Sequence, residues 1–177
     1  MIRPVYALAI AIAIVFALPL AARADPVMIT VPSDAYGFAS GQKGLNFGLP
    51  SGGGPTIGFS YLLTNRSALE LNLGLNAVFA GNTGFEFSLE IGYRAYLARF
   101  GDRLYPFIQP TFFFGRAGGA ESLAIEALFG VEYFLLEHFS ISGATGVALA
   151  IGNIGGGGSA SGRLATGTTA LFANFYF

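Results

Sequence analysis

A strict two-residue alternation is the feature that most constrains this chain. Between residues 85 and 97 the odd positions are Phe, Leu, Ile, Tyr and Ala, whereas the even positions are mostly Glu, Ser, Gly and Arg. Residues 68–79 repeat the pattern, with Leu alternating against Glu, Asn and Gly. A helix would scatter these residues around its circumference, whereas a strand sorts them onto two faces. The pattern therefore predicts strands with one apolar and one polar face.

Segments of this kind follow one another through most of the chain. We assign strands to residues 43–49, 56–63, 68–79, 85–97, 105–115, 122–134, 139–151 and 164–177. All of them except 105–115 place odd-numbered residues on the apolar face. In 105–115, Ile108, Phe112 and Phe114 face outward, whereas Gln109 and Thr111 face inward. Most segments exceed the ~5–6 residues usual in soluble strands and approach the ~9–11 that cross a bilayer at a tilt.

Composition narrows the fold class further. Charged residues make up 11% of the chain, against about 25% in a typical soluble domain. Beyond the N-terminus, no apolar run approaches the ~20 residues that a membrane helix requires. The polar strand faces hold Gly, Ala, Ser, Asn and some Glu, which suits a crowded barrel lumen. We predict an all-β, eight-stranded, antiparallel, up-and-down transmembrane barrel. The alternative is a soluble lipocalin-like barrel, with the odd residues inside.

The first residues have the features of a secretory signal. Arg3 precedes an apolar run over residues 5–18, and Ala22 and Ala24 provide small side chains at the −3 and −1 positions. We predict cleavage after Ala24, which divides the chain into a signal peptide (1–24), a periplasmic lead-in (25–42) and a barrel (43–177). The alternative is an uncleaved anchor helix. Cleavage leaves 7 of the 9 basic residues against 10 acidic ones. Without a basic patch, nucleic-acid binding is not expected.

Two passages resemble a known family. Residues 130–135 (GVEYFL), followed by 139–141 (FSI), resemble the strand–turn–strand signature of small outer-membrane β-barrel proteins. That family includes the opacity proteins and the transmembrane domain of outer membrane protein A. The closing Phe175, Tyr176 and Phe177 look like its C-terminal assembly signal. The resemblance implies a Gram-negative outer-membrane location, contact with outer-membrane lipid, and insertion by the barrel-assembly machinery. The short loops differ from those of adhesins in the family.

Several charged residues fall on the inward faces of the predicted strands. They are Glu70, Glu86, Glu90, Arg94, Glu126 and Glu132. If strands 68–79 and 85–97 pair symmetrically about Asn82, Arg94 lies opposite Glu70. An unpaired buried charge is costly, so we interpret the set as a lumen ion-pair network. The alternative is a gate or selectivity site in a narrow, porin-like channel.

Catalytic chemistry finds little support in the sequence. The one histidine, His138, lies in a predicted turn, and Ser140 and Ser142 have no recognisable oxyanion site beside them. The glycine-rich loop at 155–158 lacks the Lys and the helix of a phosphate-binding loop. There is no Cys and no metal-ligand spacing, so we expect neither metal nor cofactor. We predict a monomeric outer-membrane barrel with a structural or surface role and no catalysis. The alternative is a narrow channel for ions or small apolar solutes.

Overall fold

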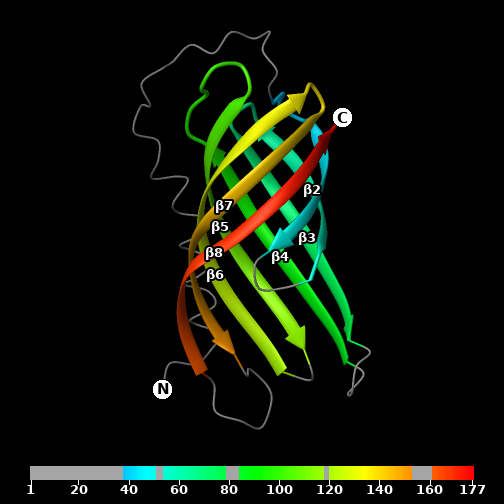
Figure 1. Ribbon diagram of the computed structural model, residues 1–177, viewed down its shortest axis with the longest axis vertical. Helices are drawn as coiled ribbons and strands as arrows, with labels where there is room; N and C mark the ends of the chain where they lie inside the picture. Colours follow the sequence, from blue (N-terminus) through cyan, green and yellow to red (C-terminus); the bar gives the residue numbers. More distant parts are fainter. Residues whose placement is uncertain (1–37, 51–53, 79–83, 118–119, 153–160) are drawn as a thin grey trace.

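The computed structural model describes residues 38–50, 54–78, 84–117, 120–152 and 161–177 (Figure 1). Within them, eight antiparallel strands pair in chain order, and the last pairs with the first to close a barrel. The strands are β1 (Lys43–Pro50), β2 (Thr56–Thr64), β3 (Ser67–Val78), β4 (Gly84–Tyr96), β5 (Leu104–Ala117), β6 (Ala120–Leu136), β7 (Phe139–Gly152) and β8 (Ser161–Tyr176). The predicted fold class, an eight-stranded up-and-down barrel, is confirmed.

Some of the predicted features lie outside this description. The signal peptide, with Ala22 and Ala24, and most of the lead-in segment fall outside the described residues. In the part of the chain that is described, no helix is long and apolar enough to cross a membrane. Most strand ends also differ from the prediction, by one to three residues. Arg116 and Glu121, predicted to lie in a loop, are paired partners in β5 and β6.

The barrel has two distinct ends. The connections β2–β3, β4–β5 and β6–β7 lie at one end, together with the C-terminal Phe177, and we call it the turn end (Figure 1). The other four connections lie at the opposite end, which we call the loop end. The wall is lower along β1 and β2, which have 8 and 9 residues, than along β6, which has 17.

Polarity is inverted relative to a water-soluble protein. Odd-numbered side chains of β1 to β4 point outward, so that Phe47 is 47% exposed and Leu75 is 58% exposed. Even-numbered Asn46, Glu70 and Asn72 point into the lumen and are at most 3% exposed. The lipocalin-like alternative, with odd residues inside, is therefore wrong.

The rule that odd-numbered residues face outward, which we call the parity of a strand, is reversed in two places. Only one of these reversals was predicted. In β5, Ile108 is exposed while Gln109 and Thr111 are buried, as expected. In β8, the pairing with β7 shifts by one residue beyond Gly146, so Leu164 pairs with Leu149 and both point outward. A bulge inserts one extra residue and so exchanges the two faces of a strand. The prediction that odd residues face outward throughout β8 is wrong for its first half.

Candidate functional site: the barrel lumen

Arg94 of β4 points into the lumen and is fully buried. Its Nη2 lies 2.9 Å from Glu70 Oε1, and its Nη1 lies 2.9 Å from Glu132 Oε2. Its Nε donates a 2.8 Å hydrogen bond to Gln109 Oε1. The guanidinium carbon lies 4.2 Å from the centre of the Phe107 ring. A planar group with five N–H donors can hold all of these partners at once. Arg94 therefore links β3, β4, β5 and β6 across the lumen.

Glu132 of β6, like Arg94, bonds to several other residues of this cluster. Tyr96 donates its hydroxyl to Oε2 at 2.8 Å, and Tyr176 donates its hydroxyl to Oε1 at 2.6 Å. Ser140 also donates to Oε1, and Asn174 Nδ2 donates to it at 3.3 Å. A buried carboxylate is tolerated only when its oxygens are well hydrogen-bonded. These donors come from β4, β7 and β8, so the Arg94–Glu132 cluster ties together most of the wall.

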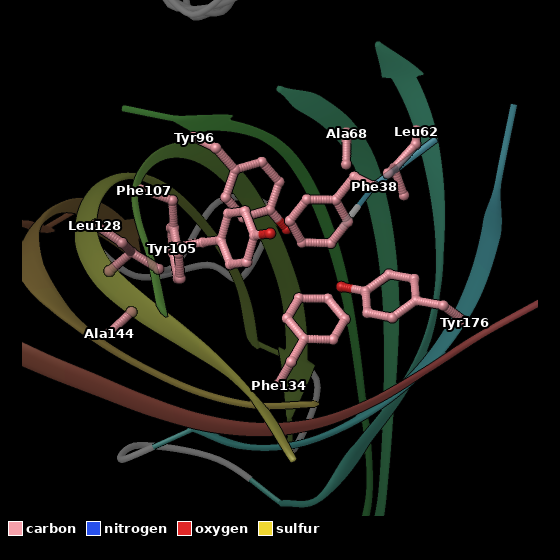
Figure 2. Packing of buried hydrophobic residues seen from close by; sticks show 10 residues of the cluster. All are labelled: Phe38, Leu62, Ala68, Tyr96, Tyr105, Phe107, Leu128, Phe134, Ala144 and Tyr176. Atoms are coloured by element: carbon pink, nitrogen blue, oxygen red, sulfur yellow. The ribbon is translucent and has the colours of Figure 1, made fainter. Parts of the chain in front are cut away.

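An aromatic cap packs inside the barrel beside this cluster, and Tyr96 and Tyr176 belong to both (Figure 2). Phe38, which precedes β1, is 6% exposed and lies among four rings. Its ring centre is 4.2 Å from Tyr96, 5.2 Å from both Tyr105 and Phe134, and 5.4 Å from Tyr176. Stacked and edge-on ring pairs stabilise beyond the area that they bury. The end of the predicted lead-in segment thus lies inside the barrel.

A tight turn directs Phe38 into the lumen. Gly41 has a φ of 85°, which glycine adopts readily because it has no Cβ. Its N–H donates to Leu62 O at 2.8 Å, while Gln42 N donates to Ala39 O at 3.1 Å. The Gln42 side chain in turn accepts from Ala39 N. These bonds fix the chain entering β1 against the end of β2.

The register places Arg94 differently from the expectation. Arg94 pairs with Ala68, and Glu70 pairs with Gly92, so the two strands are shifted by two residues from symmetry about Asn82. That register prediction is wrong. The ion pair between Arg94 and Glu70 forms along the diagonal instead, a separation that long side chains span.

The six charged residues predicted to share one network are all inward, but they divide into two groups. Glu70, Arg94 and Glu132 meet in the buried cluster. Glu86, Glu90 and Glu126 lie nearer the loop end and are half-buried. Among the described residues, Arg94 pairs with Glu70 and Glu132 and Arg99 pairs with Asp102, whereas no ion pair is found for these three acids. The lumen thus has a filled turn half and a partly open, acidic loop half.

The loop half contains polar contacts, but no cationic partner for its acids is found in the part of the chain that the structure describes. Asn76 donates from Nδ2 to Glu86 Oε2 at 2.9 Å. Glu90 is repelled by the charges of Glu70 and Glu126 and attracted more weakly by Arg94. The arrangement leaves a negative potential in this half of the lumen.

The other candidate residues are dispersed. His138 is exposed in the β6–β7 turn, where its carbonyl accepts from Tyr176 N at 2.9 Å. Ser140 and Ser142 point into the lumen, and both accept a hydrogen bond from Asn174 Nδ2. Within the described ranges, no three His, Cys, Asp or Glu side chains come together in a way that could hold a metal ion.

Sequence reasoning missed several members of the lumen cluster. Tyr96, Asn174 and Tyr176 occupy even positions, so their inward direction was readable from the alternation. Their convergence on Glu132 was not, because it depends on three strands, β4, β6 and β8, that are distant in sequence. Phe38 precedes the first strand and carries no periodic signal. Of the three closing residues, Phe175 and Phe177 are 45% and 65% exposed, whereas Tyr176 is inside the barrel.

Comparisons with known proteins identify a structural neighbour. No family model matches the sequence, and no curated protein matches it. Among solved structures, the N-terminal β-barrel domain of Pseudomonas aeruginosa OprF is similar, with 16% identity and a TM-score of 0.45. The match covers 77% of this chain and 96% of that domain. The similarity concerns the fold alone. The barrel assignment rests on the strand register described above.

Proposed function

We propose that the protein is an integral β-barrel of a bacterial outer membrane, with a structural or surface role and no catalytic role. The inverted polarity carries this proposal. Leu164, Leu171 and Phe177 are each more than 60% exposed, whereas Arg94 and Glu132 are fully buried. Each Å² of apolar surface left in water costs about 25 cal/mol, and lipid removes that cost. A closed ladder also satisfies the backbone groups, as hydrocarbon requires.

The filled turn half supports a structural role over a channel. Arg94, Phe107, Glu132 and Phe134 are each at most 2% exposed, so they occupy the space through which a solute would have to pass. An eight-stranded barrel is only just wide enough for its own side chains. We therefore favour the structural reading over the narrow channel.

Planar-bilayer recording of the purified mature chain separates these two readings. We expect no unitary current steps, because the Arg94–Glu132 cluster and the aromatic cap fill one end of the lumen. Reproducible steps from the wild-type protein would replace the structural role with a channel.

Location is tested by cell fractionation of the expressed full-length chain. We expect the protein in the outer-membrane fraction, as a monomer that migrates differently on a gel before and after heating. Recovery as a soluble periplasmic protein would refute the proposal.

We also propose that the outward Phe175 and Phe177 are read by the barrel-assembly machinery. Phe177→Ala removes an exposed ring, so we expect less assembled barrel in cells but normal refolding in detergent. Tyr176→Phe is the matched control, because its hydroxyl bonds to Glu132 inside the barrel. It should affect stability in both settings. If Phe177→Ala assembles in cells as well as wild type, the signal lies elsewhere.

A further inference from the structure

The loop half of the lumen has the properties of a binding site that the structural role does not use. Glu86, Glu90 and Glu126 point inward, are half-buried, and have no ion-pair partner among the described residues. Arg163 has the inward parity of β8 beside Ala150, but it is exposed at the rim. The acids therefore face a solvent-reached space without a compensating cation.

Buried polar groups without partners form a second, independent observation. Asn46 of β1 is 1% exposed, and neither its Oδ1 nor its Nδ2 has a hydrogen-bond partner in the described structure. Thr56 of β2 is 8% exposed, and its Oγ1 also lacks one. An unpaired buried polar atom costs about 1–3 kcal/mol. Such atoms need a further partner to complete their hydrogen bonding.

The strand register connects the two observations. Asn46 pairs with Gly58, Gly58 with Asn72, and Asn72 with Glu90, in one row across β1 to β4. A Cβ on Gly58 would overlap the Oδ1 atoms of both Asn46 and Asn72, so the two amide oxygens converge over this glycine. Glu126 acts on Glu90 through its charge from β6. The amide oxygens of Asn46 and Asn72 thus lie in the same row of the barrel as the Glu90 carboxyl group.

We propose that this space binds a small organic ammonium ion, whose three N–H groups donate to Asn46, Asn72 and Glu90, while Glu126 adds a second negative charge. An ammonium group carries a positive charge and three donors, which matches carboxylates beside amide oxygens. A metal ion fits less well, because no three metal-ligating side chains come together among the described residues. The proposal requires only the folded barrel, so it is independent of the membrane location.

The test uses the refolded, ¹⁵N-labelled barrel in zwitterionic micelles, titrated with 1,4-diaminobutane. We expect saturable shifts of the side-chain amide signals of Asn46 and Asn72. Glu90→Gln with Glu126→Gln should weaken binding by about tenfold or more, since hydrogen bonds to charged groups are the strong ones. Asn46→Ala should weaken it by a smaller factor.

Matched controls distinguish this site from general charge attraction. Glu137→Gln changes an exposed acid in the β6–β7 turn at the opposite end, so binding should be unchanged. Tetramethylammonium has the same type of charge but no N–H donor, and it should bind much more weakly. The proposal is overturned if no saturable shift appears, if tetramethylammonium or Na⁺ gives the same shifts, or if Glu137→Gln weakens binding equally. Circular dichroism verifies that each variant is folded.

Discussion

The two halves of the lumen are made by the same eight strands from the same residue types, yet they differ in structure. In the turn half, Glu70 and Glu132 meet Arg94 and are buried. In the loop half, Glu86, Glu90 and Glu126 have no such partner and stay half-buried. Because an unpaired charge in a dry interior is costly, solvent remains where the cation is missing. One arginine thus decides which acids stabilise the barrel and which remain available for a ligand.

The sharpest test of this comparison removes the hub of the turn half. Glu132→Ala removes the acceptor of the Tyr96 and Tyr176 hydroxyls and one of the two carboxylates that pair with Arg94, and breaking a buried ion pair costs about 3–5 kcal/mol. We expect a loss of that size in the free energy of unfolding, measured by urea titration in micelles with tyrosine fluorescence. Glu137→Ala, an exposed acid in the β6–β7 turn, should change it by less than about 0.5 kcal/mol. Equal effects of the two variants would contradict a structural role for the cluster.

The next largest effect is expected in the aromatic cap. Phe38→Ala removes a ring that contacts Tyr96, Tyr105, Phe134 and Tyr176. Truncating a buried Phe costs about 3–5 kcal/mol in a core, and we expect the lower part of that range because Phe38 is tethered at one end of the barrel. Phe100→Ala is the control, since Phe100 is 60% exposed. An equally small loss in both variants would show that the cap is not packed.

A smaller effect distinguishes the acids of the two halves. Glu70→Gln weakens an ion pair with Arg94, so we expect a loss of about 1–3 kcal/mol. Glu90→Gln removes a charge that Glu70 and Glu126 repel, so stability should stay within about 0.5 kcal/mol of wild type or rise. The same urea titration measures both. If Glu90→Gln costs as much as Glu70→Gln, the two halves do not differ as described.

The sequence reveals the wall of this barrel better than its interior. Side-chain direction in a strand is local, so the alternation around Leu71 and Ile91 predicts both faces. Pairing register depends on where two strands meet, which local sequence does not determine. The predicted partner of Arg94 was therefore two residues away from the observed partner, Ala68. The exchange of faces between Leu164 and Leu171 requires a bulge, which no local pattern indicates. Phe38 enters the lumen through contacts with rings from four strands, and only the folded barrel brings those rings together.

The most direct test of the difference between the halves is chemical access to the lumen. The chain has no cysteine, so single substitutions provide unique thiols: Ser88→Cys in the loop half and Ser140→Cys in the turn half. Ser88 is half-buried and Ser140 is fully buried. A charged, water-soluble thiol reagent should modify Cys at position 88 in the folded barrel, and Cys at position 140 only after unfolding. Equal labelling rates at the two positions in the folded protein would contradict a filled turn half beside an open loop half.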